Sequence, residues 1–558
     1  MFPVVIPPEA YSYGERSDGG THGVVLTKTH IVDLILNLAG YTTNKNLVSL
    51  RLLEPSCGHG AFLLPAVERL LQTYRHSDNP RDSLKNAITA FDIDPQHVST
   101  TKQRLLLLLK DHDFSSKESE LLVDAWVHQG DTLLADIESG FDFVVGNPPY
   151  VRIEQIAPVL QAEYRKRFKS IYDRADLYVA FIEKCLSLLR PDGVLSFICA
   201  DRWILNKYGA PLRRIVSEKY QVRVYVDLHT SSPFESDVVA YPSIFVLAPG
   251  KTDGVSVFKM ANGTPDECRS VYDSLHGRSS TTTSVSHTHF KEWFEGDDPW
   301  TMASPEQMKM LRRLEKQYDL IEAHGNTKIR IGVATGCDKL YLVSDPAQIE
   351  KTRLLPLVMR EDLDKGCIND AGRFVINTFE DNGQIVELSH YPKLRKYLDA
   401  NAEDIRRRHV AKKNATGWYR TIDRVYPELV KAPKLLIPDI AGANEVTFDP
   451  GRYYPHHNLY FITSDAWDLE VLGALLSSRV ALFFVWSYAV KMRGGYLRFQ
   501  AQYLRRIRVP DAKQLSGKLK NALRQAFRMR DFSGIDELAL QAYDLSALPA
   551  FEFVDTRK

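Results

Sequence analysis

The chain has 558 residues, of which 44% are hydrophobic and 25% charged, and its 71 Lys and Arg against 70 Asp and Glu leave a net charge of +1. This composition is typical of a globular protein and excludes wholesale disorder. The balanced charge excludes a uniformly basic nucleic-acid-binding protein, so any nucleic-acid surface would have to be a local patch.

From about residue 28 to 250, segments with helical periodicity alternate with short apolar segments typical of strands. The expected order is a helix around 31–38, a strand at 50–53, a helix around 62–70, a strand at 87–91, a helix at 96–109, a strand at 141–145, a helix at 178–189, and strands at 194–199, 222–226 and 243–247. This alternation predicts an α/β domain over 1–250, with a mostly parallel sheet covered by helices on both faces. Such sheets bind ligands at the carboxyl ends of their strands.

The remaining chain is organised differently. Residues 251–325 are more polar, contain a run of Ser and Thr at 279–284, and are expected to be a connecting segment. Residues 326–510 mix strands, basic loops and aromatics without the earlier alternation, which indicates a mixed α+β domain. Residues 511–558 are expected to form a helical tail.

The cysteines and the N-terminus indicate where the protein resides. The six cysteines lie far apart and form no C-x-x-C pair, which argues against a disulfide scaffold and a zinc ribbon and fits a cytoplasmic location. The N-terminal residues lack the basic and apolar regions of a signal peptide. The longest apolar run, 480–490, is too short to cross a bilayer, so no membrane association is expected.

Three acidic residues are expected to follow three separate strands. Glu54 leads into a loop in which Gly58 and Gly60 let the backbone approach a ligand closely. Asp92 could accept hydrogen bonds from both hydroxyls of a ribose, and Asp131 could accept one from an exocyclic amine, so together they would hold a nucleoside. A leucine replaces the third glycine of G-x-G-x-x-G, which argues against a nicotinamide site. Each feature alone also fits a tight strand-to-helix turn or a helix cap.

A more specific motif, Asn147-Pro148-Pro149-Tyr150, directly follows the apolar strand at 141–145. The prolines restrict the backbone and keep their carbonyls as acceptors. The Asn147 side-chain oxygen and a proline carbonyl therefore form a pair of neutral acceptors suited to an amine with two hydrogens. Tyr150 adds an aromatic face for a planar substrate. The alternative is a proline-rich turn without a chemical role.

In this order the segments resemble the gamma class of DNA adenine-N6 methyltransferases, of which the TaqI type is the best known. The resemblance covers most of residues 20–250 and is carried by Thr27, Glu54 through Gly60, Phe62, Asp92, Asp131, Asn147 through Tyr150, the stretch 176–195, and Pro233-Phe234-Glu235 before Val238-Val239. A looser similarity to the C-terminal specificity domain of the same family is carried by residues 328–336, 458–461 and 494–499.

The resemblance implies a fold and a methyl donor. The fold would be a class I S-adenosylmethionine-dependent, Rossmann-like methyltransferase domain followed by a target-recognition domain at 326–510. S-adenosylmethionine would be bound through its ribose by Asp92 and through its adenine amine by Asp131. Glu54 and the turn at Gly58 and Gly60 would lie near its methionine portion, with Thr27 as a lesser contact.

The resemblance also implies the reaction. Asn147 and the Pro148 carbonyl would hold the N6 amine of an adenine that is extruded from double-stranded DNA, while Tyr150 and Phe234 stack on the base. Direct transfer needs neither a cysteine nucleophile nor a metal. The pair His456-His457 is therefore expected to be a surface or loop pair and not a metal site.

Basic residues are concentrated in the second region. Residues 401–510 contain 17 Lys and Arg against 10 Asp and Glu, an excess of seven positive charges. The basic clusters interleave with aromatics at 406–409, 412–414, 418–420, 491–496 and 505–508. Such residues can contact phosphates and base edges, although each cluster alone also fits a solvated basic face.

Three other interpretations stay open. An RNA or protein-glutamine N-methyltransferase can carry the same tetrapeptide, but the long region after the catalytic domain favours DNA. A methyltransferase subunit of a restriction–modification or phage-defence complex would need partner subunits for activity. A fusion of a methyltransferase with a restriction nuclease is the third, but the sequence carries no clear P-D…(D/E)-x-K nuclease motif. A separately encoded restriction endonuclease would then be a further partner.

Overall fold

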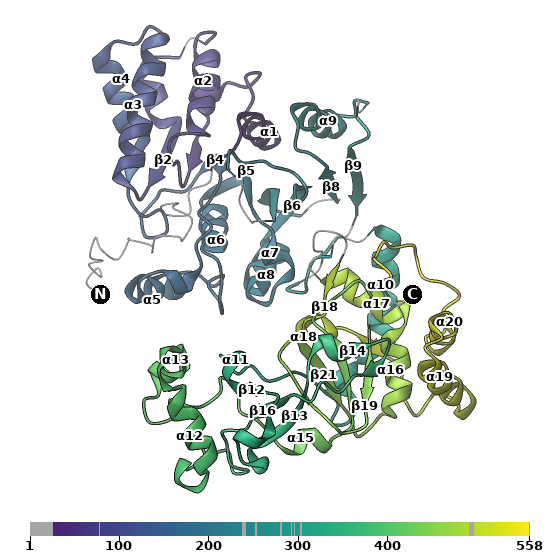
Figure 1. Cartoon of the computed structure of the whole chain (residues 1–558). Helices are drawn as coiled ribbons and strands as arrows, with labels where there is room; N and C mark the ends of the chain where they lie inside the picture. The colour runs from purple at the N-terminus through teal and green to yellow at the C-terminus, as the bar shows by residue number, and fades with distance from the viewer. Residues whose placement is uncertain are drawn as a thin grey trace. The chain divides into compact units, whose positions relative to one another are not determined.

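The computed structural model describes residues 26–77, 79–236, 241–251, 254–279, 282–291, 293–294, 296–301, 304–443, 445–489 and 496–556. The chain divides into two compact units, Met1–Thr301 and Met302–Lys558 (Figure 1). Each unit has a hydrophobic core of its own, which in the second unit consists of two clusters among the described residues.

The first unit is built on one sheet, and the predicted α/β fold is confirmed. Its strands among the described residues follow the order β3-β2-β1-β4-β5-β7-β6-β8-β9. Their bounds are β1 Leu52–Glu54, β2 Ile88–Asp92, β3 Val127–Gln129, β4 Phe141–Gly146, β5 Leu189–Ala200, β6 Tyr220–Asp227, β7 Pro242–Pro249, β8 Val255–Met260 and β9 Val285–Phe290. The strands from β3 to β5 pair in parallel, whereas β7 runs antiparallel to both β5 and β6.

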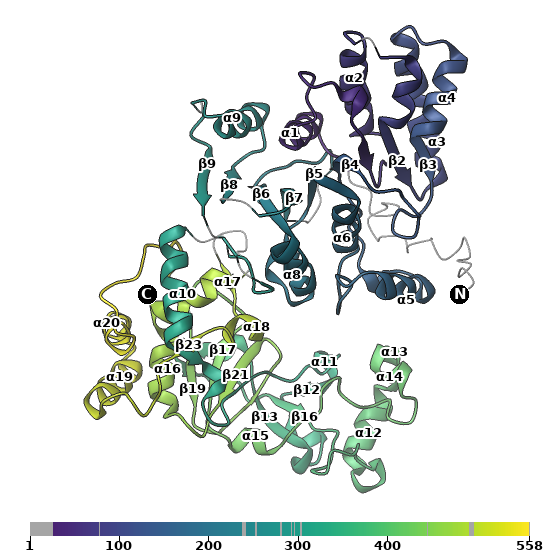
Figure 2. The same ribbon diagram turned by 180° about the vertical axis from the view of Figure 1, so that it is seen from behind.

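Helices cover both faces of this sheet (Figures 1 and 2). Their bounds are α1 Thr29–Ala39, α2 Leu63–Tyr74, α3 Pro95–Asp111, α4 Ser116–Trp126, α5 Pro158–Arg167, α6 Tyr178–Leu188, α7 Arg202–Leu205, α8 Ala210–Lys219 and α9 Pro265–Leu275. Successive strands are added toward one edge of the sheet from β1 to β3 and toward the opposite edge from β4 to β5. Because crossovers between parallel strands are right-handed, this reversal places α2 and α3 on one face and α6 on the other.

The expected connecting segment, 251–325, contributes regular structure to the sheet. Its first part forms β8, α9 and β9, and β9 pairs antiparallel with β8 at the sheet's edge. Most side chains of β9 are at least partly exposed, including His287 and His289. An edge strand with polar side chains resembles a loop in sequence, which explains the difference.

In the part of the second unit that the structure describes, the strands form two four-stranded sheets, β11-β21-β17-β19 and β12-β16-β13-β20, and three two-stranded pairs. The strands are β10 Asp319–Leu320, β11 Lys328–Ile331, β12 Leu342–Val343, β13 Leu354–Val358, β14 Leu363–Asp364, β15 Cys367–Ile368, β16 Phe374–Ile376, β17 Lys434–Pro438, β18 Ile440–Ala441, β19 Thr447–Asp449, β20 Tyr454–Pro455, β21 Leu459–Thr463, β22 Leu497–Arg498 and β23 Arg508–Val509. A buried ion pair of 2.8 Å between Lys434 and Asp449 joins β17 to β19.

The helices of the second unit are α10 Pro305–Gln317, α11 Asp338–Tyr341, α12 Pro392–Ala400, α13 Ala402–Arg407, α14 His409–Lys413, α15 Glu428–Lys431, α16 Leu469–Ser477, α17 Arg479–Tyr488, α18 Ala501–Leu504, α19 Gly517–Met529 and α20 Phe532–Ala542. The tail helix α19 packs closely on α16, because a Cβ at Gly473 would lie 2.6 Å from the ring of Phe527. Within the described ranges no single helix could span a membrane; α16 and α17 reach that length only as a pair bent by 61°.

Candidate active site

A cavity lies at the carboxyl ends of β1 to β4, where the strand order reverses between β1 and β4. Ligands of doubly wound sheets bind at such a switch point. Its empty space is about 840 Å³, including the part open to solvent. The lining includes six of the residues expected at the site: Thr27, Glu54, Gly58, Asp92, Asp131 and Asn147. Pro149 of the tetrapeptide also lines it, whereas the lining does not include the expected residues Gly60, Pro148, Tyr150 and Phe234.

The loop after β1 needs glycine at two positions. Gly58 and Gly60 have φ of +51° and +84°, which side-chain-bearing residues rarely adopt. A Cβ at Gly60 would also lie 2.4 Å from the side chain of Leu64. The Thr101 hydroxyl donates to the Gly58 carbonyl across 2.7 Å, so α3 holds this loop against the end of β1.

Asp92 is buried at the end of β2 and accepts three hydrogen bonds. The backbone amides of Gly58 and Asp94 donate to it across 2.8 and 3.0 Å, and His97 Nδ1 lies 3.1 Å from its Oδ1. The hydrogen bond to Asp92 raises the pKa of His97. A carboxylate offers roughly four acceptor positions, so a ribose diol would share Asp92 with the loop or displace one of these donors.

Asp131 has a partner that the sequence did not indicate. Its Oδ2 accepts a hydrogen bond of 2.8 Å from the hydroxyl of Tyr164 in α5, and its Oδ1 accepts the Leu133 amide across 2.9 Å. Burial raises the pKa of the Asp131 carboxyl. Tyr164 also lines the cavity, so it belongs to the candidate site.

Glu54 is a buried carboxyl with spare acceptor capacity. Its side chain is 1% exposed, and among the described residues its Oε2 has no hydrogen-bond partner. Burial, and then the negative charge of Asp92, raise the pKa of Glu54 well above its ordinary value. A positively charged ligand group near Glu54 would lower this raised pKa, because it would favour the ionised carboxylate.

Thr27, Asn147 and Phe234 come together from distant parts of the chain. Thr27 pairs with Phe234 in a short antiparallel bridge, which is flanked by a hydrogen bond of 3.0 Å from the Lys28 amide to the Pro233 carbonyl. Asn147 follows β4 and donates its side-chain Nδ2 to the Thr27 hydroxyl across 3.4 Å. The bridge to Phe234 holds Thr27, and Thr27 in turn holds the side chain of Asn147, the expected catalytic residue, at the wall of the cavity.

The two aromatic residues expected to stack on a base contact each other. The rings of Tyr150 and Phe234 lie 6.2 Å apart, centroid to centroid, with their planes at 81°. A base held between two parallel rings would require one ring to turn and the pair to separate. Phe234 is buried and Pro148 is buried beside Asn147.

These positions fit a positively charged nucleoside. Three carboxyl groups from three strand ends reach one cavity, where they could accept hydrogen bonds from hydroxyls and an amine and could balance a cation. Apolar side chains complete the walls: Leu26, Phe62, Leu177 and Phe181. Two observations support this fit to a charged nucleoside: among the described residues the Glu54 Oε2 has no hydrogen-bond partner, and the loop with Gly58 and Gly60 leaves room for a ligand.

The basic clusters of the second unit separate into internal and exposed groups. Arg408 donates to the carbonyls of Thr335, Trp418 and Arg420, so it holds loops together. Internal bonds also engage Arg505 and Arg508. The exposed basic residues of α13 and α14 are Arg406, Arg407, Lys412 and Lys413. The expected contacts at 491–495, and Val238-Val239 beside Phe234, lie outside the described residues.

Two family models match the chain. Residues 86–234 match the Eco57I restriction-modification methylase, and residues 383–509 match the TaqI-like C-terminal specificity domain. Both fall within the regions from which the sequence resemblance was drawn, and the resemblance is confirmed.

Whole-length relatives agree with these models. The chain is 45% identical to the Type II methyltransferase M.BstVI of Geobacillus stearothermophilus, over 94% of this chain and 96% of that protein. It is 43% identical to the Type II methyltransferase M.PaeR7I of Pseudomonas aeruginosa, over 97% and 95%. In fold it is similar to the Type IIL restriction-modification enzyme MmeI in complex with DNA, with a TM-score of 0.63 at 13% identity over 94% of this chain and 74% of that one.

Proposed function

Because the chain belongs to the Type II DNA methyltransferases of restriction–modification systems, we propose that it methylates the N6 amine of a specific adenine in double-stranded DNA. The observation that carries this proposal is the position of Asn147. Its amide follows β4 on the wall of the cavity that also holds Glu54, Asp92 and Asp131.

The methyl donor is S-adenosylmethionine, which supplies an electrophilic methyl group on a positively charged sulfur when it is bound. Asp92 would accept hydrogen bonds from its ribose hydroxyls and Asp131 one from its adenine amine. Glu54 would balance the positive charge of its methionine portion. Gly58 and Gly60 leave room for it, because neither carries a side chain.

Asn147 and Pro148 would orient the target amine. The Asn147 Oδ1 and the Pro148 carbonyl can each accept one of its two hydrogens. Two acceptors fixed in this way would hold the two N–H hydrogens out of the plane of the ring. The nitrogen lone pair would then be less conjugated with the ring and could point toward the methyl group. Fixed acceptors of this kind lower the barrier without reorganising during the reaction.

The adenine must leave the helix to reach this cavity. Extrusion costs a few kcal/mol of unstacking, and stacking on an aromatic side chain returns roughly 1–3 kcal/mol per base. Tyr150 and Phe234 lie next to Asn147 and Thr27 and would supply that stacking. Their present edge-to-face contact would give way to the base.

The second unit would read the DNA sequence. It contains the match to the specificity domain, and its exposed basic residues on α13 and α14 suit phosphate contacts. A separately encoded endonuclease that cuts the unmethylated sequence would complete the restriction–modification system.

The proposal is tested with the purified full-length chain, unmodified plasmid and donor labelled in its methyl group. Label should enter the DNA, and single-molecule sequencing should place it on the adenine of one recurring short sequence. Methyl groups on cytosine would overturn the adenine assignment. Label in RNA or protein but not in DNA would overturn the proposed substrate.

A further inference from the structure

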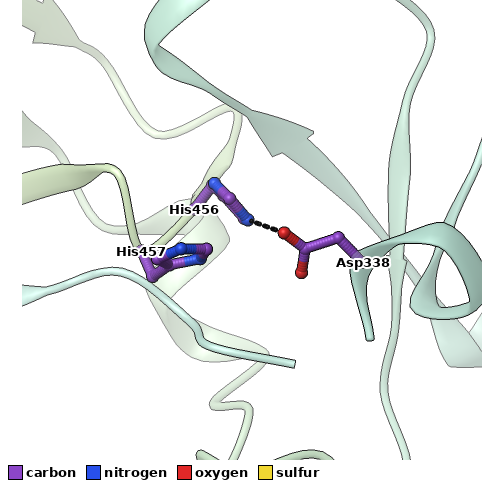
Figure 3. Close-up of side chains that lie close together, drawn as sticks. All are labelled: Asp338, His456 and His457. Atoms are coloured by element: carbon purple, nitrogen blue, oxygen red, sulfur yellow. Dashed lines mark hydrogen bonds and ion pairs between the residues drawn. The ribbon is translucent and has the colours of Figure 1, made fainter. Parts of the chain in front are cut away.

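Three potential metal ligands meet in the second unit, whereas the cavity described above belongs to the first. One ligand atom each from Asp338, His456 and His457 lies within 4.8 Å of the other two (Figure 3). The sequence favoured a loop pair of histidines without a metal, but Asp338 lies 118 residues from His456 and could not be connected with it from spacing. His456 is also not a surface residue, because its side chain is 3% exposed.

The backbone brings the two imidazoles to the same side. Successive residues of an extended strand point in opposite directions, but the chain turns directly after β20. The ring centroids of His456 and His457 therefore lie only 4.0 Å apart, with their planes at 59°. Both side chains point toward Asp338 in Figure 3.

This turn is held firmly by its neighbours. The His456 amide donates to the Val358 carbonyl across 3.0 Å, and the His457 amide donates to the Val333 carbonyl across 3.1 Å. Gly332 packs so closely that a Cβ there would lie 2.2 Å from the His456 carbonyl oxygen. The imidazoles are thus positioned before any ion binds, which reduces the entropy cost of binding.

The carboxylate is oriented as well. The Thr335 hydroxyl donates to Asp338 Oδ1 across 2.6 Å, and Asp338 Oδ2 lies 3.0 Å from His456 Nε2. Hydrogen bonds that orient a ligating carboxylate are typical of metal sites. The side chain of Asp338 is 39% exposed and His457 is exposed, so the cluster is open to solvent on one side.

We propose that Asp338, His456 and His457 bind a Zn²⁺ ion, with water in the remaining coordination position. Imidazole nitrogen and carboxylate oxygen are ligands that zinc prefers, and three protein ligands with one open position form a common zinc arrangement. Zinc–ligand bonds of about 2.0–2.1 Å place tetrahedral ligands about 3.3 Å apart, so small side-chain rotations would complete the site. The ion would link the loop at 333–338 to the turn at 455–458 and stabilise the second unit. This inference does not rest on the proposed methyl transfer.

The test uses the tag-free full-length protein, because a histidine tag would bind zinc itself. After removal of metal with a chelator, reloading with Zn²⁺ and dialysis, we expect elemental analysis to find one equivalent of Zn²⁺ per chain. Zn²⁺ in about 100-fold excess over its Kd should raise the Tm by about 5 °C. Co²⁺ in its place should give the visible absorption bands of a four- or five-coordinate ion with nitrogen and oxygen ligands.

Two variants each remove one proposed ligand without creating a cavity in the hydrophobic core, because Asp338 and His457 are at least partly exposed. His457→Ala and Asp338→Asn should each lose the retained zinc, the Tm increase and the cobalt bands. His409→Ala is the matched control, since His409 is exposed in the same unit, and it should behave like the wild type. Absence of bound zinc in the wild type, or equal zinc retention in His457→Ala, would overturn the proposal.

Discussion

The side-chain amide of Asn147 donates a hydrogen bond to the hydroxyl of Thr27, which lies 120 residues earlier in the chain. An asparagine whose nitrogen is engaged in this way directs its oxygen away from that hydroxyl, where we propose that it accepts a hydrogen bond from the target amine. Thr27 is in turn held by its bridge to Phe234. The Thr27 hydroxyl therefore orients the amide that we propose to be catalytic.

Thr27→Val should slow methyl transfer because it removes the acceptor for Asn147 Nδ2. The loss of one hydrogen bond predicts a single-turnover rate about 3- to 10-fold lower, with the Kd of the donor changed by less than about 2-fold. Thr27→Ser keeps the hydroxyl and should retain the rate. An equal loss in both variants would show that the hydroxyl does not orient Asn147.

Glu54→Gln should make the stability of the donor-free protein less dependent on pH. Since burial raises the pKa of Glu54, the folded protein keeps a proton that the unfolded chain has lost. The free energy of unfolding of the wild type therefore falls as the pH rises from the ordinary glutamate pKa of about 4.3 toward the raised value.

The amide that replaces the Glu54 carboxyl in this variant carries no charge, so the variant avoids that fall. At pH 8.5 its Tm should exceed that of the wild type by about 2–4 °C for each kcal/mol by which its free energy of unfolding is larger. The difference should shrink toward pH 5. The same variant should bind the donor more weakly in calorimetry. A Tm difference that is constant with pH would contradict a buried carboxyl with a raised pKa.

Phe234→Ala should weaken capture of the extruded base more than binding of the donor. Loss of one stacking surface predicts capture about 10- to 100-fold weaker. The measurement is the fluorescence of 2-aminopurine at the target position, which increases when the base leaves the stack. Fluorescence equal to that of the wild type would contradict the role of Phe234.

Lys412→Glu combined with Lys413→Glu should weaken DNA binding across all sequences, because both residues are exposed on α14. The slope of log K against log salt should decrease by about two. Lys518→Glu combined with Lys520→Glu on α19 makes the same change in charge elsewhere in the unit. Equal losses in the two double variants would show that only net charge matters.

Four polar residues that line the cavity were predictable because each stands at, or within two residues after, the end of a strand. Strand ends of a parallel sheet meet at one edge, so Glu54, Asp92, Asp131 and Asn147 could be placed together from their order alone. Tyr164 could not be found in this way. It lies within α5, and the sequence carries no signal that its hydroxyl reaches Asp131.

Long-range pairing explains what else could not be predicted. The bridge between Thr27 and Phe234 involves single residues of irregular segments, which leave no periodic pattern. The antiparallel direction of β7 was also hidden, because a strand buried on both faces reads the same in either direction. In the second unit many strands are only two or three residues long, too short for a period of two to be recognised.

The most direct test of the account is single-turnover methylation by Asn147→Ala with the donor already bound. We expect methyl transfer to unmodified duplex DNA to be lost, while calorimetry shows a donor Kd close to that of the wild type. Methyl transfer at the rate of the wild type would contradict the central claim that the Asn147 oxygen holds the amine for attack.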